Sequence, residues 1–270
     1  MHRKIRIEEK HGNNEKYEKR CDSGVSEILG SVMIILIISV TIAILFAMAW
    51  PIMEDVRGNI REGGVKDAFY SFKEMVDRTL AGVDPAMSIK FPLAGGRLYT
   101  DSSTKINIGV WQWNASNGSM DLVFSTSARY QNIGRLIYDY DNKWGYVYEF
   151  GGLIKRQGSF SKVISSPRIT YLERSLGHRY LSLPIVMVTG NMSYGGSGTP
   201  QVKVKVLEVK TYDFHNATLD FAIESEDNTA WYNYLNSIGM NVSIVGNQVT
   251  TFQRHYDEIH FTFYRIQVGY

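Results

Sequence analysis

The pattern of hydrophobic and polar positions begins with a long apolar run. The 26 residues between Glu27 and Glu54 contain no charged side chain. About 20 apolar residues are enough for a helix to cross the hydrocarbon core of a bilayer. A buried core helix or a cleaved secretory signal would also be apolar. A secretory hydrophobic region, however, has about 7–15 residues and ends at a small-residue cleavage site, which does not follow here. The sequence therefore predicts a retained transmembrane helix over residues 25–51.

An amphipathic run follows directly and predicts a helical stalk over residues 52–85. Its apolar residues recur at helical spacings on one side, and charged residues fill the other positions. The apolar set is Ile52, Val56, Ile60, Val65, Phe69, Phe72, Val76 and Leu80. Gly63-Gly64 interrupts this pattern, so we expect a kink or a break there. The segment Ala81–Pro85 predicts the end of the helix, because glycine and proline both oppose its continuation.

The remaining residues, 86–270, show the alternation that is typical of half-buried β-strands. The segment Ile106–Val110 alternates, and Gln201–Val206 places its valines on one face and its lysines on the other. The last segment, EIHFTFYRIQVGY, changes phase between Phe263 and Tyr264, which predicts a bulge or a twist. The fold class is therefore α+β, with an N-terminal transmembrane and stalk helix followed by an all-β, sandwich-like domain.

Turn signals separate the predicted strands. They lie at Asp141-Asn142, Gly151-Gly152, Ser165–Pro167 and Gly195–Pro200. The glycine-rich segment Gly190–Pro200 lacks the Gly-Lys-Ser/Thr ending of a phosphate-binding loop, so we interpret it as a hairpin loop. One short helix is predicted near Asp227–Ile238, which begins with residues that favour a helix N-cap.

The distribution of charge gives the predicted helix an orientation. Residues 1–24 contain seven Lys or Arg and five Asp or Glu, so the whole formal net charge of +2 lies there. The positive-inside rule places this basic leader in the cytoplasm and the C-terminal domain outside the cell. The rest of the chain is formally neutral, which argues against a nucleic-acid-binding domain. The single cysteine, Cys21, excludes a disulfide within the chain and a cysteine-based zinc site.

Small residues form a stripe within the predicted transmembrane helix. Ser39, Ala43 and Ala47 are four residues apart, so they share one helical face. Such a stripe allows two helices to approach closely within a membrane. Small residues are also common in membrane helices without this role, so the spacing leaves both interpretations open.

Five sequons match the acceptor pattern for N-glycosylation, and all of them follow the apolar run. They are at Asn114, Asn117, Asn191, Asn216 and Asn241. Their restriction to the predicted external domain agrees with the orientation, because glycans are added on that side. We therefore expect a glycoprotein, the alternative being coincidence in a domain rich in Ser and Asn.

The sequence predicts no enzyme, cofactor or metal centre. It contains no GxSxG, HExxH or P-loop pattern. His255 and His260 are five residues apart on a predicted strand, so their side chains face opposite sides and we expect no metal pair. Trp111 and Trp113 would share one strand face, where they could stack on a sugar. We favour packing of these two rings in the interior.

The segment CDSGVSEILGSVMIILIISV, from Cys21 to Val40, resembles the N-terminus of archaeal type IV pilin-like proteins, which carry a class III signal peptide. The matching features are a short basic leader that ends in a small residue, Gly24, followed directly by the apolar helix. The resemblance implies that a membrane-embedded prepilin peptidase cleaves between Gly24 and Val25, and that the helix is retained. The order of apolar helix, amphipathic extension and β-rich head also resembles pilins.

The resemblance also implies a role for Glu27, the third residue of the mature chain. Cleavage would leave a free amine on Val25 beside an apolar helix. The carboxylate of Glu27, on the same or a neighbouring subunit, could compensate this charge. Alternatively, Glu27 lies in the headgroup region as an ordinary residue at a helix N-terminus.

The sequence therefore predicts a pilin-like membrane protein that serves as a structural or minor subunit of a surface filament. The resemblance implies that its partners are the membrane, prepilin peptidase and other pilin-like subunits, which associate through the N-terminal helix. The alternative is a permanently anchored extracytoplasmic β-domain that binds a ligand or partner at the cell envelope. The domains under either interpretation are a leader (1–24), a transmembrane helix (25–51), a stalk (52–85) and a β-rich domain (86–270).

Overall fold

The computed structural model describes residues 14–82, 86–126, 132–174 and 177–269, with side chains described from residue 28 onward. The chain divides into two compact units, which meet between Ile60 and Arg61. The elements are α1 (Asn14–Leu80), β1 (Ala86–Lys90), β2 (Arg97–Asp101), β3 (Lys105–Asn114), β4 (Ser119–Ser125), β5 (Arg135–Tyr140), β6 (Trp144–Glu149), β7 (Gly152–Gln157), β8 (Phe160–Ser165), β9 (Thr170–Glu173), β10 (Arg179–Thr189), β11 (Ser193–Gly195), β12 (Gln201–Glu224), α2 (Asn228–Ser237), β13 (Val242–Val245), β14 (Gln248–Thr251) and β15 (Arg254–Gly269).

The helix α1 contains the apolar run. Its described part is long and apolar enough to cross a membrane, with a mean hydropathy of 3.0 in its most apolar window. Pro51 lies inside the helix. The helix ends at Leu80, directly before the segment 81–85 that was predicted to end it. The helix continues through Gly63-Gly64, so the prediction of a break at these glycines is wrong. A glycine weakens a helix by only about 1 kcal/mol, which the packing on either side of it can offset.

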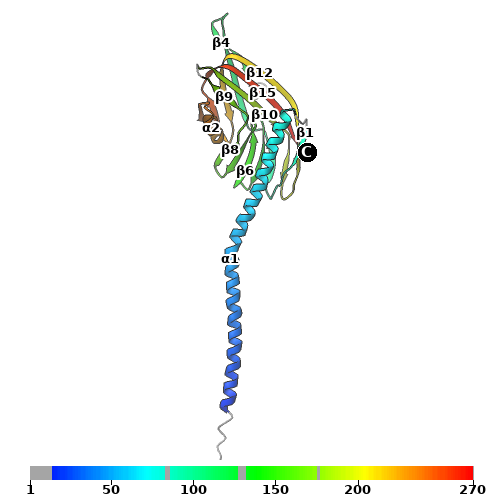
Figure 1. Ribbon diagram of the computed structural model, residues 1–270, viewed down its shortest axis with the longest axis vertical. Helices are drawn as coiled ribbons and strands as arrows, with labels where there is room; N and C mark the ends of the chain where they lie inside the picture. The colour runs from blue at the N-terminus through cyan, green and yellow to red at the C-terminus, as the bar shows by residue number, and fades with distance from the viewer. Residues whose placement is uncertain (1–13, 83–85, 127–131, 175–176, 270) are drawn as a thin grey trace, which may run out of the picture. The chain divides into compact units, whose positions relative to one another are not determined.

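The second unit contains two β-sheets (Figure 1). In sheet A the strand order is β13-β14-β12-β15-β10-β9, with β1 and β3 paired to β12 and β4 paired to β3. In sheet B the order is β11-β2-β5-β6-β7-β8. The long strands β12 and β15 are antiparallel, whereas β10 runs parallel to β15. The expected β-rich domain with two sheets is therefore confirmed.

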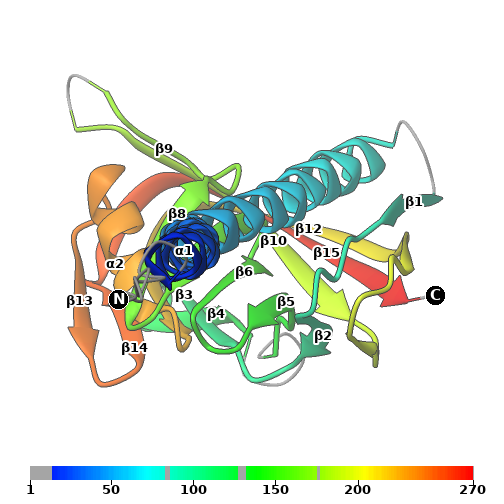
Figure 2. The same ribbon diagram turned by 90° about the horizontal axis from the view of Figure 1, so that it is seen from below.

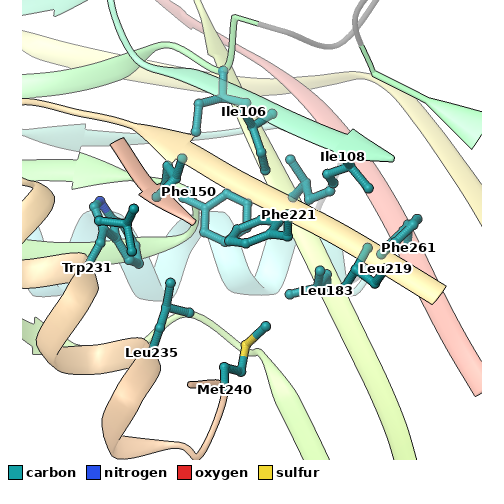
Figure 3. Close-up of a cluster of buried hydrophobic side chains, with 14 of the residues drawn as sticks. Ile106, Ile108, Phe150, Leu183, Leu219, Phe221, Trp231, Leu235, Met240 and Phe261 are labelled. Carbon is teal, nitrogen blue, oxygen red and sulfur yellow. The ribbon is translucent and has the colours of Figure 1, made fainter. Parts of the chain in front are cut away.

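A hydrophobic core lies between the two sheets and α2 (Figure 3). Sheet A contributes Ile108 and Phe221, and sheet B contributes Val147, all fully buried. The rings of Phe150 and Trp231, the latter from α2, meet edge to face with their centroids 5.6 Å apart. The predicted helix near residues 227–238 is thus confirmed, because it supplies apolar side chains to this core.

A second core lies on the other face of sheet B, where the part of α1 from Arg61 to Leu80 covers the β domain (Figure 2). Phe69 and Phe72 are fully buried there. The centroid of Phe69 is 5.7 Å from that of Tyr146, and the centroid of Phe72 is 5.1 Å from that of Tyr148. Full burial of one such side chain contributes about 1.5–3 kcal/mol. The C-terminal part of α1 is therefore a structural component of the β domain.

Three local predictions need correction. The burial pattern of β15 does change phase after Phe263, but the extra residue of the irregularity is Leu207 on the neighbouring strand β12. Asp227 occupies the N-cap position of α2, yet its carboxylate binds Arg156 and makes no cap hydrogen bond. The segment after β10 is no hairpin loop, because it carries β11, which pairs with β2 in the other sheet.

Candidate functional site

The apolar part of α1 carries the predicted assembly residues. Gly24, Val25 and Glu27 lie in the first part of α1, whose side chains are outside the described residues. Ser39, Ala43 and Ala47 are described, and all three are exposed along α1. The helical conformation confirms that they share a face, because residues four apart are neighbours on a helix surface. The structure thus gives the shared face and the exposure of these small residues, which are the features that close helix packing in a membrane requires.

Two hydroxyl groups in this segment, those of Ser31 and Thr41, are satisfied within the helix. Ser31 Oγ donates to the carbonyl of Ile28 at 2.9 Å, and Thr41 Oγ1 donates to the carbonyl of Ile37 at 2.8 Å. An unpaired polar group is costly in a lipid interior. The described apolar segment can therefore lie in lipid or against another helix without leaving these donors unpaired.

The predicted apolar side of the stalk divides into two parts that the sequence did not distinguish. Val65, Phe69 and Phe72 are fully buried by the β domain. Ile52, Val56 and Ile60, by contrast, are 64%, 51% and 70% exposed. The spacing of residues 52, 56 and 60 forms a stripe one turn apart along the helix. We call these three residues the uncovered stripe, because no described residue of the chain buries them.

Polar contacts fix the start of the covered part of α1. Glu62 Oε1 lies 2.5 Å from Lys155 Nζ of β7 and accepts a hydrogen bond from the Tyr146 hydroxyl at 3.2 Å. The preceding residue, Arg61, donates to the Tyr140 hydroxyl at 3.4 Å. Burial, followed by the negative charge of Glu62, raises the pKa of the Tyr146 hydroxyl. This hydroxyl therefore remains a donor at physiological pH.

A partly buried polar cluster joins sheet B to the segment before α2, and the sequence did not predict it. Arg135 Nη2 lies 2.6 Å from Asp101 Oδ2 and 2.9 Å from Glu226 Oε2. Arg156 Nη2 lies 2.6 Å from Asp227 Oδ2. The available signal was the acidic pair Glu226-Asp227 at the start of the predicted helix. The cluster secures α2 to sheet B.

Glu149 is the least solvated acid of this cluster. It is fully buried and accepts a hydrogen bond from Ser225 Oγ at 3.1 Å. Burial, and then the nearby charge of Asp227, raises the pKa of Glu149 to about 7. Such a value suits an acid–base catalyst, but this side chain is closed to solvent and no substrate can reach it. Its effect is on folding stability.

The sequons differ in how their amide groups are held. Asn114 Nδ2 donates to Asp121 at 2.7 Å, and Asn117 Nδ2 donates to the same carboxylate at 3.3 Å. Asn191, Asn216 and Asn241 are exposed. No described hydrogen bond engages the side-chain amides of these last three residues. The side chains of Asn114 and Asn117 are therefore partly constrained, whereas those of the other three sequons are exposed to solvent.

The candidate ligand groups are not brought together as a metal or cofactor centre. Within the described ranges, no group of three or more His, Cys, Asp or Glu side chains is arranged to hold a metal ion. His260 Nδ1 contacts Asp213, whereas His255 pairs with Thr218 further along the same strand pair. Trp113 is 62% exposed, so the expectation of interior packing is wrong for this ring. Met120 and Leu122, which pair with Trp113 and Trp111 across the β3–β4 hairpin, are exposed on the same face.

Comparisons with known proteins identify a family but no activity. The chain is 26% identical over 207 residues to an uncharacterized protein of Archaeoglobus fulgidus, across 64% of this chain and 68% of that protein. No solved structure matches the chain. A family model described as a family of unknown function (DUF7289) matches residues 23–268. This match spans most of the sequence, and the chain therefore belongs to the family of unknown function DUF7289.

Proposed function

We propose that this chain is a pilin-like, single-span membrane protein, and that it acts as a structural or minor subunit of a type IV pilus-like surface filament. The observation that supports this function best is the uncovered stripe of Ile52, Val56 and Ile60. The stripe begins at Ile52, inside the charge-free run, and Val56 and Ile60 extend the apolar helical surface beyond it. A neighbouring helix would bury it, as packing in a filament requires.

The proposed topology follows from the charge and the apolar run. The basic leader is cytoplasmic, and the β domain is extracellular. The proposed processing step is hydrolysis of the Gly24–Val25 peptide bond by prepilin peptidase, with water as the co-reactant. The mature chain then starts at Val25 and keeps its helix as a membrane anchor before assembly.

The proposed assembly surface combines the small-residue stripe with the uncovered stripe. Ser39, Ala43 and Ala47 allow close approach of a second helix, and the uncovered stripe continues the contact. Glu27 would compensate the new amine of Val25 on the same or an adjacent subunit. This role needs no catalysis, cofactor or nucleic acid.

The first experiment determines the N-terminus by mass spectrometry of protein purified from membranes. We expect a mature chain that begins at Val25. The variant Gly24→Val should remain unprocessed, because the peptidase requires a small residue there. Gly30→Val is the matched control, since no atom lies within 4 Å of its added Cβ and it is remote from the bond. A mature protein that begins at Met1 would overturn the proposal.

The second experiment tests polymerisation. We expect the protein in filaments sheared from the cell surface, at a level that falls in the Gly24→Val variant. If a correctly processed protein is retained entirely in the membrane, the filament role is wrong although the processing step stands.

The alternative function is a permanently anchored β-domain that binds a ligand or partner at the cell envelope. The observation that favours it is the β3–β4 hairpin, where Trp113, Met120 and Leu122 are exposed. Under this alternative, Trp113→Ala would abolish binding of cell-envelope material to the protein, and the N-terminus would remain Met1. Under the filament function the variant would still enter sheared filaments.

Glycosylation is part of the proposal, because all five sequons lie in the proposed extracellular domain. We expect glycans on at least one of the exposed sites Asn191, Asn216 and Asn241. Glycopeptide mass spectrometry of protein from the native host tests this, with Asn→Gln variants at each site as controls. Unmodified peptides at all five sites would contradict it.

A further inference from the structure

An aromatic row crosses one end of sheet B. Tyr140 pairs with Trp144, Trp144 with Gln157, and Gln157 with Phe160 across three adjacent strand pairs. Residues directly opposite in antiparallel strands project from the same face of the sheet. The four side chains therefore form one row, which we call the aromatic row. Phe160, at 81%, is the most exposed of the large hydrophobic side chains in the described part of the chain.

The row lies on the face of sheet B that α1 covers, directly beside the first covered residues of the helix. Lys155 is two residues before Gln157, so it shares that face, and it contacts Glu62 of α1. Tyr140 at the other end of the row accepts a hydrogen bond from Arg61. The turn that contains Gly158 donates to the carbonyl of Lys143 at 3.0 Å. The row therefore lies beside Arg61 and Glu62, the first residues of α1 that contact sheet B.

The row is rigid at its tyrosine and tryptophan end. The rings of Tyr140 and Trp144 are stacked with centroids 5.2 Å apart, and Tyr138 stacks on Trp144 at 5.4 Å. A side chain at Gly95 would approach the Tyr140 ring to 3.5 Å. These contacts hold the rings in place, so the exposed parts of the row are fixed features of the surface.

If α1 crosses a membrane over its charge-free run, chain length limits how far Arg61 can lie from that membrane. Only six residues separate Glu54, the first charge after the apolar run, from Arg61. At a rise of 1.5 Å per residue, a helix covers this stretch in about 10 Å. The headgroup region adds roughly 5–8 Å on each side of the hydrocarbon core. The domain end that begins at Arg61 is therefore within reach of the lipid headgroups.

The chemistry of the row fits a lipid interface. Trp and Tyr are enriched at membrane–water boundaries, where their rings are apolar and their polar atoms remain hydrated. The exposed lysines Lys143 and Lys162 flank the row and can approach anionic headgroups. An exposed phenylalanine beside such residues can insert into the interfacial layer.

We infer that the aromatic row docks the β domain on the surface of the membrane that α1 crosses, with Phe160 inserted among the lipid headgroups. The docking restrains the β domain while the protein is anchored in the membrane. This inference depends on α1 crossing the membrane, but it requires neither cleavage at Gly24 nor polymerisation. It can therefore hold if the filament function fails.

The experiment uses the full, uncleaved chain in vesicles of phosphatidylcholine and phosphatidylglycerol. A fluorophore is attached at Gln157→Cys in a Cys21→Ser background, so that Phe160 stays in place. We expect lipids with a spin-labelled headgroup to quench this fluorophore several-fold more than the same fluorophore at Val245→Cys. Val245 is a matched control because it is 68% exposed and lies at the end of β13, in the other sheet.

The variant Phe160→Ser should reduce the quenching at position 157 to the level of the control. It should leave thermal stability unchanged, because the Phe160 side chain is exposed. Equal quenching at positions 157 and 245 would overturn the inference. Quenching that disappears when the protein is diluted in excess lipid would indicate contact with a second copy, and would also overturn it.

Discussion

The two parts of the amphipathic stretch of α1 have similar sequences but different surroundings. From Val65 to Val76 the apolar side chains are buried against sheet B. From Ile52 to Ile60 similar side chains are exposed. The first part obtains its burial from the same chain. The second has no described partner in the chain, so its apolar character makes sense only if lipid or another molecule covers it. The same pattern thus serves folding in one place, and we propose that it serves association in the other.

The largest expected effect is on the free energy of unfolding, which should respond to a substitution in the buried part of α1 and not in the exposed part. Phe72→Ala removes a fully buried ring that meets Tyr148 edge to face, and should lower the free energy of unfolding by about 3–5 kcal/mol. Chemical denaturation of the full chain in detergent micelles measures it. Ile60→Ala, in the uncovered part, is the control and should change stability little. Equal losses in the two variants would mean that both parts are folded against the domain.

The second effect concerns Glu149, which lies away from α1 and should make the stability of the β domain depend on pH. The pKa of Glu149 is raised by burial from 4.5 to about 7 in the folded state. Ionisation of this acid is therefore easier in the unfolded chain, and its contribution to stability falls as the pH rises from 4.5 to about 7. The full change is about 3 kcal/mol.

The variant Glu149→Gln should remove this dependence, so that its stability relative to the natural protein improves between pH 5 and pH 8. Denaturation curves at a series of pH values provide the measurement, with the exposed Glu74→Gln as the control. A natural protein whose stability is flat over this range would show that Glu149 keeps an ordinary pKa.

A smaller effect concerns association through the uncovered stripe. Val56→Asn should weaken incorporation into sheared filaments about tenfold, which corresponds to about 1.4 kcal/mol. It should not alter the unfolding of the β domain, because the Val56 side chain is exposed within the chain. Asp55→Asn is the control on a neighbouring, polar position. If both variants assemble normally, the stripe is not an assembly surface.

The smallest effect lies at the boundary between the two parts. Gly63→Ala should stabilise the helix by about 0.5–1 kcal/mol, because no atom lies within 4 Å of the added Cβ and alanine favours the helix. Thermal unfolding of the full chain measures it. A loss of stability would show that this position needs the flexibility of glycine, as the sequence pattern first indicated.

The elements with strong periodicity were predictable. The end of α1 after Leu80, the alternating strand that buries Ile106, Ile108 and Val110, and the helix near Asp227 all follow from local spacing and turn residues. The exposure of Trp113 and the aromatic row were not predictable. An alternating pattern does not show which strand face is covered, because that depends on the second layer.

The sequence by itself determined that a charge-free helix precedes a β-rich region, since 26 uncharged residues and alternating strands leave few other structures. It also determined the charge asymmetry and the positions of the sequons. Only the tertiary structure decided which half of the stalk is buried, that Glu149 is closed to solvent, and that Tyr140, Trp144 and Phe160 lie in one row. These properties depend on contacts between residues far apart in the chain, whereas periodicity reports only on neighbours.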